Sequence, residues 1–329
     1  MKKFFKWSGR VIIIIILLML CLVGYVKLFL PDVGDAGELK LVYTPEMIER
    51  GAYLANSVSA CMDCHSTRDW TQFSAPLKPG TLGMGGEKFD QALGFPGVFY
   101  SRNITPYGIS RYTDGELFRV ITTGVTKEGR AMFPVMPYHY YGKSDKEDIY
   151  AIIAYLRSLP SIESDVPESE ADFPFSIILN TIPHKASFVE RPKPTDSVAY
   201  GGYLVNMAGC IECHTKAENG QILAGLEFGG GREFMLPFGK VHTPNITPDE
   251  TGIKAWTVDA FVQRFKQYKD SSYKSPVMGP NDYNSFMPWT MYAGMTESDL
   301  RSIYKFLRTI KPIKNEVIRF TPKDQLASK

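Results

Sequence analysis

The chain opens with one continuous apolar segment, and its later apolar positions are periodic. Residues 11–30 read VIIIIILLMLCLVGYVKLFL, in which Lys27 is the one charged residue. Twenty such residues can cross a hydrocarbon core of about 30 Å as a helix. Four basic residues and no acidic residue precede this segment: Lys2, Lys3, Lys6 and Arg10. Because basic flanks stay on the cytoplasmic side, we predict a cytoplasmic segment 1–10, a membrane anchor 11–30 and export of the remainder.

A cleaved signal peptide is the main alternative for this segment. Its apolar region would be shorter and would end at a small-x-small cleavage site. Residues 31–37 offer a poor site of that kind. Cys21 does not match a lipoprotein motif, because Leu20 replaces the small residue that precedes the lipidated cysteine. We therefore expect an uncleaved, single-pass anchor in the inner membrane, with the rest of the chain in the periplasm.

Beyond the anchor, the periodicity is that of amphipathic helices. Two segments carry apolar residues at intervals of three and four: Ile149, Ile152, Ile153 and Leu156, and Leu300, Ile303, Tyr304 and Leu307. Capping boxes at Thr113 and Ser144, and a capping threonine at Thr257, mark helix starts. Helices are also predicted at 46–57 and 197–206, and Gly- and Pro-rich loops at 76–97 and 225–239. Since strands and helices do not alternate, an α/β enzyme fold is excluded, and the predicted class is all-α.

An internal repeat divides the chain into two halves. Five segments recur in the same order: 53–54 with 203–204, 61–65 with 210–214, 103–106 with 245–248, 136–137 with 287–288, and 148–157 with 299–308. His65 and Met136 are 71 residues apart, and His214 and Met287 are 73 apart. Equal order and nearly equal spacing indicate a duplicated domain.

The repeat sets the predicted domain boundaries. Residues 45–160 and 197–315 form the two copies, and 161–196 form a proline-rich acidic linker between them. Residues 316–329 form a tail. The apolar part of the linker, 173–182, is predicted to pack against a domain, with a membrane or partner contact as the alternative.

Composition excludes several classes of protein. The 329 residues suggest about two domains. A net charge of +2 gives no sign of a nucleic-acid partner. With 44% hydrophobic and 22% charged residues, the chain is not disordered as a whole. Five cysteines are too few for a disulfide scaffold, so their placement carries the information.

Four of the cysteines form two Cys-x-x-Cys-His motifs, which are attachment motifs for haem c. Cysteines one helical turn apart reach the two vinyl groups on one edge of the porphyrin, and each forms a thioether. The adjacent histidine then ligates the iron. We predict two covalently bound haem c groups, held by two sets of residues: Cys61, Cys64 and His65, and Cys210, Cys213 and His214.

Other uses of the cysteines fit less well. A zinc ribbon spaces its cysteine pairs by roughly 15–20 residues, whereas Cys64 and Cys210 are 146 apart. A thioredoxin-like motif needs a βαβ context, which the sequence lacks. Disulfides within each pair are possible in an oxidising compartment, but they do not need the histidines.

A methionine thioether opposite the histidine makes an electron-transfer iron and raises its potential. Met136 and Met287 are the predicted iron ligands, because each lies in a Met-Pro-aromatic segment at a matching distance from its histidine. Met132 competes with Met136 but has no counterpart in the other half. Met278, Met291 and Met295 compete with Met287 and also lack counterparts.

The repeated Asn-Ile-Thr-Pro segments suggest contacts near the haem edge. We predict that Asn103, Thr105, Asn245 and Thr247 bond haem propionates or fix the loop near them. An Asx turn that ends at proline is the alternative. Tyr112, Trp256 and Arg102 are weaker candidates for propionate contacts. His139, His184 and His242 are interpreted as surface histidines rather than ligands.

Whole segments resemble a known family. SRNITP at 101–106, GRAMFPVMPY at 129–138 and NITPDETGI at 245–253 resemble the membrane-bound cytochrome c subunits of bacterial alcohol, aldehyde and gluconate dehydrogenases. The resemblance covers about residues 45–315 and implies class I cytochrome c domains, small helical bundles with His/Met-ligated haem. It also implies periplasmic electron transfer from a dehydrogenase toward quinone or a terminal oxidase. Those subunits usually carry three haem motifs and this chain has two, so the partner stays open.

The sequence therefore predicts an anchored dihaem cytochrome c, an electron-transfer protein and not an enzyme. Its expected partners are a dehydrogenase subunit, a quinol-oxidising complex or a terminal oxidase. A dihaem peroxidase is one alternative and needs an open iron. A dihaem subunit of a haem–copper oxidase is another, and a haem-based sensor is a distant further one.

Overall fold

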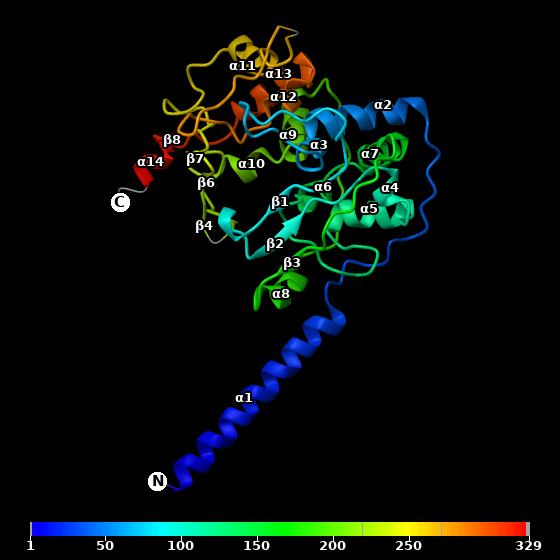
Figure 1. The fold of residues 1–329 in the computed structure, drawn as a ribbon, viewed down its shortest axis with the longest axis vertical. Coiled ribbons are helices and arrows are strands. Elements are labelled where there is room, and N and C mark those ends of the chain that lie inside the picture. Colours follow the sequence, from blue (N-terminus) through cyan, green and yellow to red (C-terminus); the bar gives the residue numbers. More distant parts are fainter. Residues whose placement is uncertain (1, 219, 271, 327–329) are drawn as a thin grey trace.

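The apolar N-terminal segment forms one long helix, α1 (Lys2–Phe29), which projects from the rest of the chain (Figure 1). The computed structural model describes residues 2–218, 220–270 and 272–326. By length and composition, Phe4–Phe29 can cross a membrane. A signal sequence near the N-terminus would pass the same test, so an uncleaved anchor stays a prediction. The predicted cytoplasmic segment is the first part of α1, apart from Met1, which lies outside the described residues.

Two long helices cross at close range in each half. In the first half α2 (Pro45–Tyr53) crosses α7 (Lys146–Ser158), and in the second α9 (Ser197–Met207) crosses α13 (Glu297–Leu307). Glycine permits the close approach, because a Cβ on Gly51 would lie 1.8 Å from the carbonyl oxygen of Ala151. A Cβ on Gly201 would lie 2.0 Å from the carbonyl oxygen of Ser302. The four long helices agree with the helical segments predicted from the sequence.

Shorter elements complete each half. In the first half they are η1 (Leu54–Val58), α3 (Cys61–Cys64), η2 (Gln91–Leu93), α4 (Pro106–Ile109), α5 (Asp114–Thr123) and α6 (Tyr138–Tyr141). In the second half they are α10 (Cys210–Cys213), α11 (Val258–Lys266), α12 (Trp289–Tyr292) and the C-terminal α14 (Lys323–Leu326). The predicted caps of α5 and α11 are confirmed: Thr113 forms a full capping box, and the Thr257 side chain accepts from the backbone N–H of Ala260.

The helix that follows Ser144 begins differently from the prediction. Asp145 is the N-cap of α7, and its carboxylate accepts from the backbone N–H of Glu147 at 2.9 Å. The Ser144 hydroxyl instead donates to the carbonyl oxygen of Tyr140 at 3.0 Å. A capping box at Ser144 was therefore wrong, because the Ser144 hydroxyl bonds the preceding turn and the equally suitable Asp145 caps the helix instead.

The predicted all-α class is wrong, because the body contains three small antiparallel sheets. The strands are β1 (Lys88–Phe89), β2 (Gly97–Tyr100), β3 (Glu170–Ala171), β4 (Ala217–Glu218), β5 (Gln221–Ile222), β6 (Glu233–Leu236), β7 (Gly239–His242) and β8 (Phe320–Pro322). They pair in the orders β1-β2-β3, β4-β5 and β6-β7-β8. Strands of two to four residues are too short for an alternating pattern to stand out. Several lie in the glycine-rich stretches that the sequence analysis treated as loops.

The linker is tied to the first half. Its strand β3 pairs with β2, and the backbone N–H of Asp172 donates to the carbonyl oxygen of Pro96 at 2.9 Å. Helix α8 (Phe175–Ile178) and the turn η3 (Leu179–Thr181) follow β3 and contact α1. The segment predicted to form a tail contains β8, which pairs with β7 and extends the last sheet. Residues 327–329 lie outside the described part.

The two halves share one apolar core and exchange equivalent contacts. The Tyr53 hydroxyl in the first half donates to Asp299 Oδ2 in the second at 2.5 Å. At the matching positions, the Tyr203 hydroxyl donates to Asp148 Oδ2 at 2.7 Å. Each hydroxyl oxygen also accepts a backbone N–H that precedes the partner helix, from Thr296 or Asp145. The contact therefore has approximate two-fold symmetry, with each half giving a tyrosine and receiving one.

The two tyrosine contacts differ in what else supports the carboxylate. Asp148 also accepts from Arg50 at 2.9 Å and from Arg191 of the linker. Among the described residues, the Asp299 carboxylate accepts from the Tyr53 hydroxyl and pairs with no arginine. We predict that Tyr53→Phe lowers the free energy of unfolding by about 2–3 kcal/mol, because a mostly buried carboxylate loses its partner.

Tyr203→Phe is the matched control and is expected to cost about 1 kcal/mol, since two arginines remain on Asp148. Chemical denaturation of both variants, followed by circular dichroism, gives the comparison. Equal losses in the two variants would contradict this account of the contact between the halves.

Candidate functional site

Both Cys-x-x-Cys-His segments form a single helical turn directly after the first long helix of their half. Helices α3 and α10 hold the cysteines. A left-handed residue precedes each turn, Ala60 at φ 47° and Gly209 at φ 62°. The preceding carbonyl oxygens accept from equivalent tyrosines, Tyr141 at 3.4 Å and Tyr292 at 3.1 Å. The two segments thus have the same local geometry.

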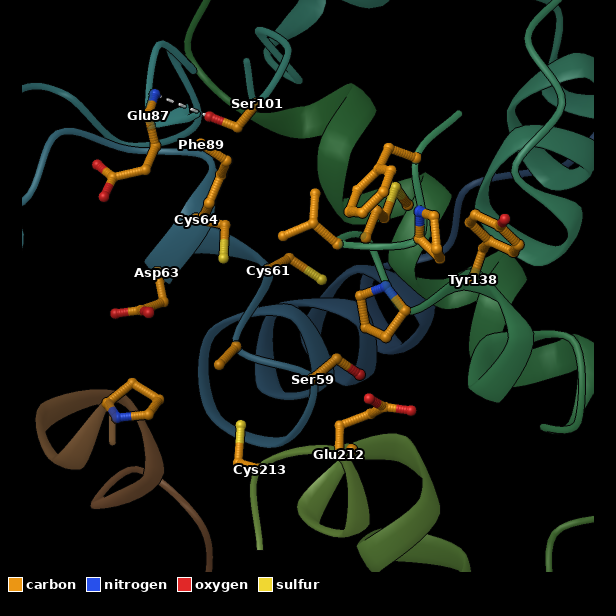
Figure 2. A pocket seen from close by; sticks show the side chains of 18 of the residues that line it. Ser59, Cys61, Asp63, Cys64, Glu87, Phe89, Ser101, Tyr138, Glu212 and Cys213 are labelled. Carbon is orange, nitrogen blue, oxygen red and sulfur yellow. Dashed lines mark hydrogen bonds between the residues drawn. The ribbon is translucent and has the colours of Figure 1, made fainter. Parts of the chain in front are cut away.

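One cavity of about 2550 Å³ joins the two segments. It is lined by all eight residues predicted to hold the cofactors: Cys61, Cys64, His65, Met136, Cys210, Cys213, His214 and Met287. Figure 2 shows Cys61 and Cys64 of the first half and Cys213 of the second around the same space. The fold therefore brings together residues that are up to 226 positions apart in the sequence.

Backbone carbonyls orient the two imidazoles. His65 Nδ1 lies 2.6 Å from the carbonyl oxygen of Arg102, and His214 Nδ1 lies 2.9 Å from that of Pro244. A carbonyl oxygen accepts, so Nδ1 carries the proton and Nε2 keeps its lone pair. Burial lowers the pKa of both histidines, which favours the neutral form. A neutral imidazole with a free Nε2 is the state that ligates a metal.

The Asn-Ile-Thr-Pro segments hold the loops that supply these carbonyls. Asn103 Oδ1 accepts from the backbone N–H of Thr105 at 2.9 Å and from its hydroxyl at 2.8 Å. Asn245 and Thr247 repeat both contacts at the same distances. The asparagine amides donate to the carbonyl oxygens of Ile162 and Ile313.

These contacts match the Asx turn that was the alternative in the sequence analysis. The four side chains are buried and bond the chain itself, and both asparagines also line the cavity. These bonds fix the loop. The Arg102 guanidinium is likewise engaged, with the carbonyl oxygens of Val166 and Pro167 in the linker. Tyr112 and Trp256 both line the cavity.

The Met287 segment is held by a loop from the other half. The Ser74 hydroxyl donates to the carbonyl oxygen of Met287 at 2.7 Å and accepts from the backbone N–H of Trp289 at 3.0 Å. The backbone N–H of Ser74 donates to Asn284 Oδ1 at 2.8 Å. Ser74 and Ala75 both have left-handed backbones, at φ 62° and 43°. Sequence analysis missed this brace, because Ser74 lies outside the repeated segments.

Acidic residues, Asp63 and Glu212, occupy the third position of the two motifs. The sequence analysis assigned them no role. Glu212 accepts a hydrogen bond from the Tyr140 hydroxyl at 2.6 Å and forms an ion pair with Arg232 at 3.1 Å. Figure 2 shows Glu212 and its neighbour Cys213 in the second motif. Burial opposes ionisation of Glu212, but hydrogen bonds from His139 and Tyr140 and the charge of Arg232 outweigh it and lower its pKa to about 2.

Asp63, the equivalent residue, pairs with the buried Arg68 at 2.9 Å, and Arg68 also pairs with Glu87 at 2.7 Å. Burial raises the pKa of Asp63 to about 6. The Arg68 guanidinium lies 4.3 Å from the centre of the Trp70 ring. The sequence did offer a signal for Asp63 and Glu212, because both copies of the motif have an acidic residue at the third position.

The three other histidines also line the cavity. His139 is 3.3 Å from Glu212, and His242 Nδ1 donates to the carbonyl oxygen of Ile318 at 3.0 Å. His184 is exposed and lines the edge of the cavity. Within the described ranges, no three His, Cys, Asp or Glu side chains cluster as a metal site, which gives the zinc alternative no support.

The residues around the cavity fit haem c. Each half offers two thiols, one imidazole with a free Nε2 and one thioether on the same space. Burial raises the pKa of Cys61, Cys64 and Cys210 to about 12 and that of Cys213 to about 11. The thiols are therefore neutral before modification. Thiols suit covalent attachment of a porphyrin, and imidazole and thioether are suitable axial ligands of its iron.

Comparison with known proteins points the same way. No protein-family model matches the chain. It is 27% identical over 295 residues to the cytochrome c subunit of alcohol dehydrogenase (quinone) from Komagataeibacter europaeus, which covers 83% of this chain and 58% of that subunit. It is 28% identical over 291 residues to the fructose dehydrogenase cytochrome subunit of Gluconobacter japonicus, covering 82% and 53%.

A diheme c-type cytochrome from Cereibacter sphaeroides is 30% identical over 200 residues, 57% of this chain and 63% of that protein. The chain thus spans little more than half the length of the dehydrogenase subunits that it matches. A gluconate 2-dehydrogenase cytochrome c subunit from Pantoea cypripedii also matches, at 25% identity over 298 residues. Over most of its length, the chain is therefore similar to the cytochrome c subunits of alcohol, fructose and gluconate dehydrogenases, and the resemblance predicted from its motifs is confirmed.

Proposed function

We propose that the chain is a membrane-anchored dihaem cytochrome c that receives electrons from a dehydrogenase and passes them to a downstream respiratory acceptor. The observation that carries the proposal is the single cavity lined by two complete sets of cysteines, histidine and methionine. The names of the relatives support electron transfer rather than an enzymatic activity such as that of a peroxidase.

Each set of residues has a defined task in this proposal. The two cysteine sulfurs form thioethers that fix one haem c, which supplies an iron that alternates between two oxidation states. His65 and His214 ligate through Nε2, while the carbonyls of Arg102 and Pro244 hold their rings in place. Met136 and Met287 would supply the thioether sulfurs as further iron ligands. With both ligands bound, the iron would exchange electrons and leave no site for a substrate.

Each half forms its own haem-binding domain, with the boundaries 45–160 and 197–315. Because both sets line one cavity, two haem groups held there would lie near each other and could exchange electrons. In this proposal α1 is the anchor in the inner membrane, and its basic N-terminal flank supports a periplasmic location of the body.

The methionine assignment predicts separate effects for the two halves. Met136→Ala and Met287→Ala each remove one thioether, so about half of the haem in either variant should bind carbon monoxide after reduction, and its potential should fall. Met132→Ala is the control, because Met132 lines the same cavity but is not a predicted ligand. Visible spectra with a redox titration give the readout. If either Met variant kept the redox titration curve of the wild-type protein, that methionine would not be an iron ligand.

Ser74 provides a second test, confined to the second half. Ser74→Gly removes the hydroxyl that braces the Met287 segment, and glycine suits the left-handed backbone there. We expect a weaker methionine–iron bond, seen as partial carbon monoxide binding and a lower potential for one haem only.

The control for this variant is Ala75→Gly, which relaxes the neighbouring left-handed residue and keeps the hydroxyl. No hydroxyl of the second half bonds the backbone of 136–138 among the described residues, so the first haem should not change. A change at both haem groups, or at neither, would contradict the brace.

A further inference from the structure

An uncharged apolar segment of the linker lies on the surface beside the anchor. Residues 173–182 contain no charged residue. Phe173 is 82% exposed and Ile178 is 48% exposed. Large exposed apolar side chains next to each other mark a contact surface. We call Phe173, Pro174 and Ile178 the linker face.

The linker face lies at the level of the last turn of α1. Helix α8 and the turn η3 contact α1, and α8 lies at the end of the body nearest that helix (Figure 1). Val26 is buried there, although the described residues of α1 are otherwise largely exposed. Lys27 and Leu30 line one small cleft together with Ser176 and Leu179.

This level corresponds to the boundary of a bilayer. The apolar segment that can span the membrane ends at Phe29. Tyr25 and Phe29 stack at 5.5 Å, and aromatic rings collect at the membrane–water boundary. Leu28 and Phe29 are also exposed on α1. An element in contact with this turn would lie at a similar depth once α1 is inserted in a bilayer.

The linker face is held rigidly to the first half. Strand β3 precedes it and pairs with β2, and the rings of Phe175 and Phe133 are 5.6 Å apart. The same segment also forms part of the cavity wall, through Phe175, Ile178, Leu179 and Ile182. Ile178 thus belongs both to the linker face and to the cavity wall, whereas Phe173 and Pro174 do not line the cavity.

We propose that the linker face rests in the boundary between lipid headgroups and acyl chains, as a second membrane contact of the body. This inference rests on the proposed membrane insertion of α1. Burial of large apolar side chains in the acyl region is favourable, so this contact would oppose tilting of the body on its anchor. The contact fixes the first half, and with it the His65 side of the cavity, next to the membrane.

Spin labels on the full, haem-loaded chain test the proposal in nanodiscs of phosphatidylethanolamine and phosphatidylglycerol. Single cysteines replace Phe173, Val277 or Leu18 in a Cys21→Ser background. Val277 is the matched control, because it is 81% exposed and lies in the second half. Leu18 lies within the span of α1 and reports its insertion.

The Phe173→Cys label should show a several-fold higher ratio of oxygen to nickel-chelate accessibility than the Val277→Cys label. Equal ratios at the two positions would overturn the proposal. So would a Phe173→Cys label shielded from both reagents, since a partner protein would then cover the face. If the Leu18→Cys label reached the nickel chelate, the anchoring itself would be wrong, and the two failures are thus distinguishable.

Discussion

The reciprocal contact between the two halves is the constraint on which the rest of the structure depends. Tyr53 and Tyr203 each reach a carboxylate at the start of the other half's last long helix, Asp299 and Asp148. This arrangement places equivalent helices against each other about an approximate two-fold axis. Tyr53 and Tyr203 lie on α2 and α9, the helices that precede the two cysteine segments. The contact therefore brings both cysteine segments to a common cavity.

Within that symmetric frame, the two sites are supported differently. Both histidines are oriented by a backbone carbonyl, and both loops are fixed by an Asn–Thr turn. The Met287 segment, however, is braced by Ser74 of the other half. The acidic residues within the motifs also differ: burial raises the pKa of Asp63, whereas hydrogen bonds and the charge of Arg232 together outweigh burial and lower the pKa of Glu212. Two sites with the same ligands and different surroundings are expected to have different potentials.

The site was more predictable from the sequence than the fold class. The duplicated motifs predicted eight candidate ligands, and all eight line one cavity, because ligand chemistry imposes short and recognisable spacings. The sheets were missed, since strands such as β3 and β8 are two or three residues long and pair with segments distant in the sequence. Ser74 could not be found either, because its partners lie more than 200 residues away and it lies outside the recurring segments. A repeat in the sequence reveals what the two halves share, but not which residues of one half contact the other.

The central claim is that both sets of residues close around a haem iron. The most direct measurement is the visible spectrum of the purified, dithionite-reduced wild-type protein with and without carbon monoxide, calibrated for haem per chain. The account predicts two haem c groups per chain and no response to carbon monoxide. One haem per chain, or clear carbon monoxide binding by the wild-type protein, would contradict it.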